Sequence, residues 1–110
     1  MAYLTCNYDL SILSRVHGDD DGFIHPINIV SDNAYIFSAF TPNQKEKLTQ
    51  GNGLMYFHHS YAILADTFNQ NTKLKDFWTI TATATTTSNE TFAAALEAKN
   101  YPFYVFQFHP

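Results

Sequence analysis

An alternating run of threonines places the strongest constraint on the fold of this 110-residue chain. Every second residue from Thr79 to Thr85 is threonine, and the residues between them are Ile80, Ala82 and Ala84. Alternation with a period of two is typical of a β-strand, because successive side chains point to opposite faces. We therefore expect a strand with one apolar face on a core and one face in water.

Two further strands are expected after this one. Residues 91–98 alternate again, and the apolar side chains on one face are Phe92, Ala94, Leu96 and Ala98. Ser88-Asn89 suits the turn between the two strands, and Pro102 separates the second strand from the apolar run 103–108. Three consecutive strands at this spacing predict a β-meander that leads to His109.

The clearest helix signal is Thr41-Pro42-Asn43-Gln44. Thr41 can cap the helix, Pro42 suits its first turn and Gln44 completes a capping box, while Gly51 is a normal stop. The other expected elements are a helix end or short strand at 2–9, strands at 11–16 and 54–58, a strand broken by Pro26 at 23–30, an apolar segment at 35–40, and a short helix or turn at 69–77.

Composition indicates one globular domain. The chain is 45% hydrophobic and 16% aromatic, and its net charge is −4. Its six basic residues form no stripe, so we expect no nucleic-acid partner. The uncharged, Thr-rich stretch 77–88 is too short and too polar to span a membrane, and the N-terminus shows no signal-peptide pattern.

Residues that could hold a metal or carry a modification are few. His17, Asp19 to Asp21 and His25 match neither an EF-hand loop nor a zinc-binding helix face, so we interpret them as part of an acidic surface loop. Asn89-Glu90-Thr91 is an N-glycosylation sequon in a predicted turn. It would make the chain a glycoprotein only if the protein enters the secretory pathway.

Five motifs occur in a fixed order from Ile36 onward. They read Ile36-Phe37-x-x-Phe40-x-Pro42, Tyr56-Phe57-His58, Phe68-Asn69-x-Asn71-x-Lys73-Leu74-x-x-Phe77, Lys99-Asn100-Tyr101-Pro102-Phe103-Tyr104 and Gln107-Phe108-His109-Pro110. Together they resemble the C-terminal half of gamma-glutamyl hydrolases, cysteine hydrolases of peptidase family C26. The resemblance implies an α/β fold of the class I glutamine amidotransferase type (flavodoxin-like). Residues 1–110 would then be one partial domain with an open, mostly parallel sheet and flanking helices.

The resemblance also implies roles for two histidines. His109 occupies the position of the family's His-Pro-Glu histidine, the base that pairs with the cysteine nucleophile. His58 matches the Asn-Phe-His histidine, which lies near the substrate, although Tyr56 replaces the asparagine. His59 has no counterpart and is expected to face solvent. The family removes gamma-linked glutamate from folyl and antifolyl polyglutamates without a cofactor, and its members are often lysosomal, vacuolar or secreted.

Cys6, the single cysteine, excludes an intrachain disulfide and does not suit the nucleophile position. The family's nucleophile lies in a Gly-x-Cys-x-Gly elbow, and no glycine flanks Cys6, so we expect a buried, apolar cysteine. By this alignment the nucleophile would precede Met1. The chain would carry the base alone and be inactive by itself, which leaves open whether it is an enzyme.

Two further interpretations remain open. The chain could be part of a longer active enzyme. Alternatively, it could be a non-catalytic structural or interaction protein built on a truncated or degenerate hydrolase fold. The expected partner is the N-terminal half of the domain or another protein chain that covers the exposed sheet.

Overall fold

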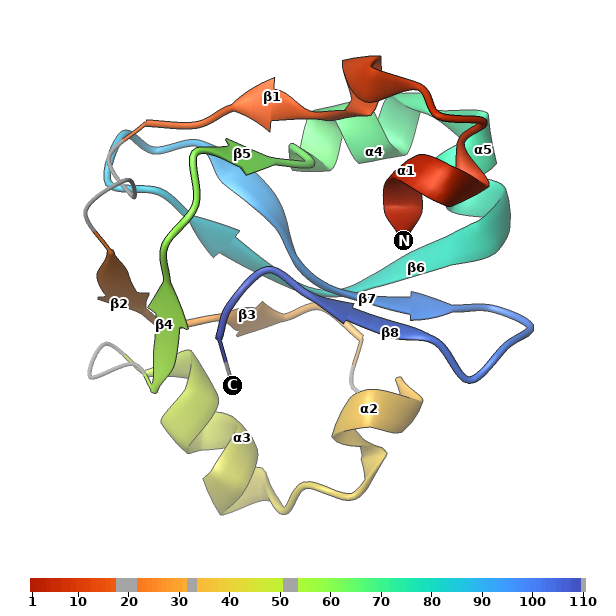
Figure 1. Cartoon of the computed structure of the whole chain (residues 1–110). Helices are drawn as coiled ribbons and strands as arrows, with labels where there is room; N and C mark the ends of the chain where they lie inside the picture. The colour runs from red at the N-terminus through yellow and green to blue at the C-terminus, as the bar shows by residue number, and fades with distance from the viewer. Residues whose placement is uncertain (18–21, 32–33, 51–53, 110) are drawn as a thin grey trace.

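A four-stranded antiparallel sheet in the order β3-β6-β7-β8 runs through the middle of the structure (Figure 1). The structure is a computed structural model that describes residues 1–17, 22–31, 34–50 and 54–109. In chain order its elements are α1 (Ala2–Thr5), the 3₁₀ helix η1 (Leu10–Ile12), β1 (Ser14–Arg15), β2 (Phe23–His25), β3 (Asn28–Ile29), α2 (Tyr35–Ser38), α3 (Pro42–Thr49), β4 (Met55–Phe57), β5 (Tyr61–Ala62), α4 (Ala65–Gln70), α5 (Thr72–Phe77), β6 (Trp78–Thr85), β7 (Thr91–Ala98) and β8 (Tyr104–Phe106).

The predicted meander is confirmed. β6 and β7 pair from Trp78↔Ala98 to Thr85↔Thr91, and β8 pairs with the second half of β7. Asn89 lies in the turn between β6 and β7 with a φ of 66°, a left-handed conformation that asparagine tolerates better than most residues. The final strand is shorter than expected, because only residues 104–106 of the apolar run pair with β7.

The alternating face of β6 is only partly exposed to water, contrary to the sequence expectation. The pairing of β6 with β7 shifts register on both sides of Ala82, as at a β-bulge. Thr79 and Thr85 are exposed, but Thr81 is completely buried, and its hydroxyl has no hydrogen-bond partner among the described residues. A regular period of two therefore predicted the strand correctly and the environment of Thr81 incorrectly.

Both faces of the sheet are covered, which explains why Thr81 is buried. Helices α4 and α5 lie on one side of the sheet, and α2 and α3 lie on the other (Figure 1). The first apolar cluster includes Phe37 of α2, Leu48 of α3, Phe57 and Phe92. The second includes Cys6, Ile12, Phe68, Leu74 and Trp78.

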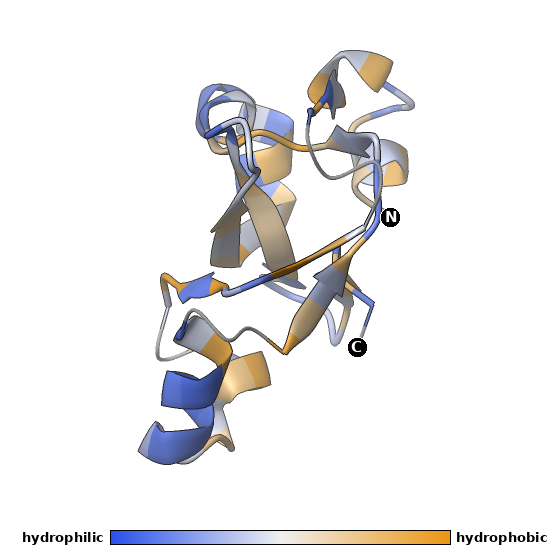
Figure 2. Cartoon of the chain, turned by 90° about the vertical axis from the view of Figure 1, so that its left-hand side faces the viewer, coloured by the Kyte–Doolittle hydropathy of each residue, from blue (hydrophilic) through white to orange (hydrophobic). Residues whose placement is uncertain are grey.

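Helix α3 begins as the sequence predicts. The Thr41 side chain accepts a hydrogen bond from the Gln44 amide, and the Gln44 side chain accepts one from the Thr41 amide. Figure 2 shows that α3 is largely hydrophilic, and Leu48 is its buried side chain. Gly51, which was expected to follow the helix, lies outside the described residues.

Pro26 divides the segment 23–30 between two sheets. β2 pairs with β4, whereas β3 pairs with β6. This change of partner confirms the break predicted at Pro26. The physical reason is that proline has no N–H and cannot donate a ladder hydrogen bond. Residues before it belong to a two-stranded ribbon, and residues after it belong to the main sheet.

Two short segments differ in detail from the prediction. The expected strand 11–16 begins instead as η1, because the Asp9 side chain accepts a hydrogen bond from the Ser11 amide and caps a 3₁₀ turn. The segment 69–77 contains the end of α4 and all of α5, and the Asn71 side chain caps α5 through the Leu74 amide.

The fold is mixed α/β with open sheets, as the resemblance implied. All strand pairs between described residues are antiparallel, so the parallel strands implied for the complete fold are not among them. None of the helices in the described ranges combines the length and apolar character needed to cross a bilayer.

Candidate functional site

Tyr56 lies between the two histidines that the sequence singled out. It is the middle residue of β4, paired with Ile24 of β2 on one side and bridged to His109 on the other. The His109 amide donates a hydrogen bond to the Tyr56 carbonyl over 2.9 Å. Directly paired residues of antiparallel strands share a face, so Ile24, Tyr56 and His109 form one row.

Both imidazoles contact the Tyr56 ring. The ring centroid of Tyr56 lies 5.9 Å from that of His109 and 6.3 Å from that of His58. Both histidines are exposed, so their nitrogens are accessible to a ligand. Residues far apart in the sequence thus meet around one exposed phenol ring.

The segment 107–109 connects the main sheet to the β2–β4 ribbon. The Gln107 amide donates to the Ala94 carbonyl of β7, and the His109 amide donates to Tyr56 of β4. Phe108, between them, is buried against Phe57. The backbone on both sides of Phe108 is therefore held by hydrogen bonds, which fixes the position of His109.

His59 lies on the opposite face from His58, and the expectation that it faces solvent is wrong. Its ring packs against Phe57 at 5.8 Å and against Phe92 at 5.0 Å, and both of its ring nitrogens are buried. Phe57 and His59 are two residues apart, so they share a face in an extended segment. The signal for this placement was the strand period of two, which puts His59 on the face of the apolar Phe57 and His58 on the face of Tyr56.

Cys6 is buried in the second apolar cluster, as expected. Burial raises the pKa of its thiol, which disfavours the nucleophilic thiolate. His58 and His109 are each adjacent in the chain to a residue of the first cluster, Phe57 and Phe108 respectively. Cys6 is thus packed in a different part of the core from the residues that support His109.

The predicted acidic loop is only partly visible, because Asp19, Asp20 and Asp21 lie outside the described residues. His17 is exposed, and its amide donates to the Glu90 carboxylate over 2.8 Å. His25 is half-buried beside Phe23 and Phe57. In the described ranges, no three His, Cys, Asp or Glu side chains are placed to hold a metal ion.

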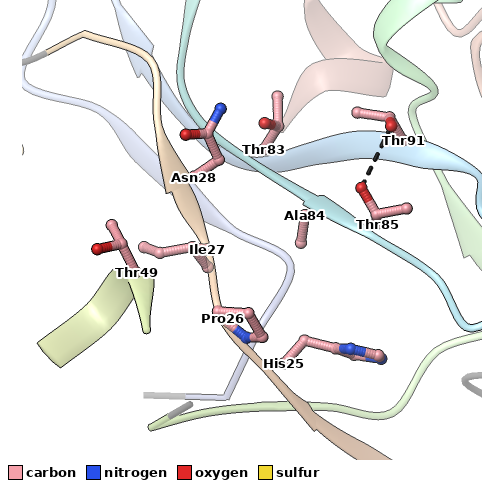
Figure 3. Close-up of a pocket in the computed structure, with 9 residues that line it drawn as sticks. All are labelled: His25, Pro26, Ile27, Asn28, Thr49, Thr83, Ala84, Thr85 and Thr91. Carbon is pink, nitrogen blue, oxygen red and sulfur yellow. Dashed lines mark hydrogen bonds between the residues drawn. The ribbon is translucent and has the colours of Figure 1, made fainter. Parts of the chain in front are cut away.

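A groove of about 420 Å³ with both polar and apolar lining residues opens where β3 begins and β6 ends (Figure 3). Its lining residues are His25, Pro26, Ile27, Asn28, Thr49, Thr83, Ala84, Thr85 and Thr91. The hydroxyls of Thr85 and Thr91 lie 3.3 Å apart. His25 is next to Ile24 on β2 and therefore on the opposite face of the ribbon from Tyr56. The groove includes neither His58 nor His109.

The described architecture is a mixed α/β fold with open sheets, compatible with part of a hydrolase-like α/β domain. The chain is 29% identical over 100 residues to gamma-glutamyl hydrolase 1 of Arabidopsis thaliana, which covers 90% of this chain and 28% of that protein. It is 34% identical over 53 residues to gamma-glutamyl hydrolase B of Dictyostelium discoideum, which covers 48% of this chain and 15% of that protein. No family model matches.

These relatives confirm the resemblance to gamma-glutamyl hydrolases that the motifs indicated. The chain spans 28% and 15% of the lengths of the two relatives. The hydrolase activity named for the whole relatives is therefore only a proposal for this chain.

Proposed function

We propose that this chain is a partial domain that supplies the histidine side of a gamma-glutamyl hydrolase-like active site. The observation that carries the proposal is the meeting of His58 and His109 on Tyr56. An exposed imidazole held through its own main chain is suited to proton transfer, because a base must be accessible and fixed in place.

In the proposed reaction, His109 accepts the proton of a cysteine thiol. Cys6 is the single cysteine of residues 1–110 and is buried, so this thiol comes from a different segment or chain. The thiolate attacks the carbonyl carbon of the gamma-glutamyl amide, and the C–N bond breaks as His109 returns the proton to the leaving amine. His109 then deprotonates a water that hydrolyses the thioester, which releases the acid and regenerates the thiol. His58 would contact the substrate, and folyl polyglutamates are the proposed substrate class.

The proposal also accounts for Cys6. Its thiol is buried in the second apolar cluster with a raised pKa, so it is unsuited to act as the attacking group. The chain alone would therefore not cleave gamma-glutamyl bonds.

A chimaera tests the proposal. In it, this chain replaces the aligned segment of the Arabidopsis gamma-glutamyl hydrolase 1, and hydrolysis of a pteroyl-gamma-glutamate is measured. We expect activity that His109→Asn lowers by at least a thousandfold, whereas the exposed control His17→Asn leaves it unchanged. Retention of activity in His109→Asn would refute the assignment of the base.

The second candidate is a non-catalytic interaction protein. It is favoured by β8, which forms one edge of the main sheet and exposes Tyr104 and Phe106. An inactive chimaera that still folds, together with a stable complex of this chain with another protein, would support this alternative.

A further inference from the structure

Tyr56 contributes more to the exposed face than to the core. Its side chain is 42% exposed, and the adjacent Phe57 on the same strand is fully buried and supplies the packing. The Tyr56 ring instead contacts His58 and His109. The position therefore does not require an aromatic side chain for burial.

The hydroxyl end of the Tyr56 ring lies close against the backbone of Gly22. A Cβ on Gly22 would lie 2.2 Å from the Tyr56 hydroxyl oxygen and 2.8 Å from Cζ, both closer than real Cβ contacts. Gly22 also has a φ of 80°, which L side chains rarely adopt. Glycine thus suits the backbone conformation at this position, and a Cβ here would displace the Tyr56 ring from its present place.

We propose that Tyr56 is a positioning residue that orients the His109 imidazole, and that the absence of a side chain at Gly22 leaves the space that the Tyr56 ring needs in this position. The inference rests on the proposed function of His109 as base. Proton transfer requires a ring nitrogen to point at the reacting group, so a freely rotating imidazole lowers kcat more than it changes KM. The carbonyl of Tyr56 fixes the His109 backbone, and its ring restricts the His109 side chain.

The first test measures side-chain rotation directly, without activity. Three-bond couplings across χ1 of His109 are recorded by NMR on dilute, isotope-labelled chain. We expect values of a single rotamer in the original chain and in Tyr56→Phe, which keeps the ring. We expect averaged values in Tyr56→Leu and in Gly22→Ala. Amide signals of β6 and β7 report whether each variant is folded.

A single rotamer of His109 in folded Tyr56→Leu would overturn the inference. Gly22→Ala combines a backbone strain with a clash, so Tyr56→Leu decides the matter if Gly22→Ala does not fold. Tyr61→Leu is the matched control, because Tyr61 is an exposed strand tyrosine on β5 rather than β4.

The second test separates this inference from the proposed function. In the chimaera, Tyr56→Leu is expected to lower kcat at least tenfold and change KM less than twofold, and Tyr61→Leu to change neither. If His109→Asn abolishes activity but Tyr56→Leu leaves kcat unchanged, the positioning role is wrong and the base assignment stands. If His109→Asn has no effect, the base assignment is wrong, and the NMR result still decides whether Tyr56 orients the ring.

Discussion

The amide of His109 donates a hydrogen bond to the carbonyl of Tyr56 over 2.9 Å. This bond joins residues that lie far apart in the sequence and brings His109 beside Tyr56 of β4, two residues before His58. It also places the two histidines on an exposed face, while the neighbouring Phe57 and Phe108 are buried. Substitutions of the exposed histidines should therefore affect activity, substitutions of their buried neighbours should affect stability, and mutation can separate the two effects.

The adjacent residues His58 and His59 should respond in opposite ways to substitution. His58→Ala should lower hydrolysis by the chimaera while leaving stability within about 0.5 kcal/mol, because the side chain is exposed. His59→Ala should destabilise the chain by about 1–3 kcal/mol, because its ring packs between Phe57 and Phe92. Urea unfolding and the hydrolysis assay measure the two effects. Equal stability of both variants would contradict the placement of His59.

Thr5→Val should destabilise the chain by about 1–3 kcal/mol. The Trp78 indole N–H donates to the Thr5 hydroxyl over 2.8 Å, and Trp78 is almost completely buried. Valine has nearly the same shape but leaves this donor without a partner. Thr5→Ser keeps the hydroxyl and is expected to cost clearly less. Urea unfolding monitored by Trp78 fluorescence compares the two variants, and equal midpoints would argue against a role for the hydrogen bond.

Thr81→Val should stabilise the chain by about 1 kcal/mol, because it replaces a buried hydroxyl that has no hydrogen-bond partner among the described residues. The hydrogen bond from the Val30 amide goes to the main-chain carbonyl of Thr81 and is retained. Thr83→Val, on the same strand but half-exposed, is the control and should change little. A lower unfolding midpoint for Thr81→Val would show that its hydroxyl is satisfied in solution.

Cys6 should be slow to react with thiol reagents until the chain unfolds. It is fully buried, and burial raises its pKa above the usual value for a thiol. A smaller fraction of thiolate is therefore present in the folded chain than in the unfolded chain at the same pH, and the folded thiol needs a higher pH to ionise. Rates measured with a disulfide reagent from pH 7 to pH 9, with and without urea, check this. Rapid labelling of the folded chain at pH 7 would contradict it.

The edge strand β8 should make the chain associate at high concentration. Tyr104 and Phe106 are exposed on an edge strand, and such strands pair readily with other chains. Tyr104→Lys should reduce this association, because a charged side chain on an edge disfavours pairing. Sedimentation over a range of concentrations measures it, with Leu4→Lys, at an exposed position on helix α1, as control. A concentration-independent monomer would show that β8 is protected in another way.

The parts of the fold that depend on local patterns could be predicted from the sequence. The period of two in 79–85 predicted β6, and the capping box at Thr41 predicted the start of α3. The break at Pro26 was predictable because proline cannot donate a ladder hydrogen bond. Each of these signals is contained within a few consecutive residues.

Features that depend on packing could not be predicted in this way. The burial of Thr81 follows from a bulge and from clusters on both faces of the sheet, neither of which a single strand reveals. His58 and His109 were singled out by resemblance to a family, and the structure brings both onto Tyr56. The close approach of Gly22 and Tyr56 joins residues that are distant in the sequence, so no local sequence pattern predicts it.

The two hydrogen bonds of Gln107 and His109 have a consequence for local opening. The Gln107 amide is bonded to the main sheet, and the His109 amide is bonded to the β2–β4 ribbon. Because both amides belong to one short segment, release of that segment would break both hydrogen bonds together. In hydrogen–deuterium exchange, these two amides should therefore give the same free energy of opening once each rate is corrected for its intrinsic value. The order of the histidine site would then be set by the free energy of that opening and not by the stability of the whole domain.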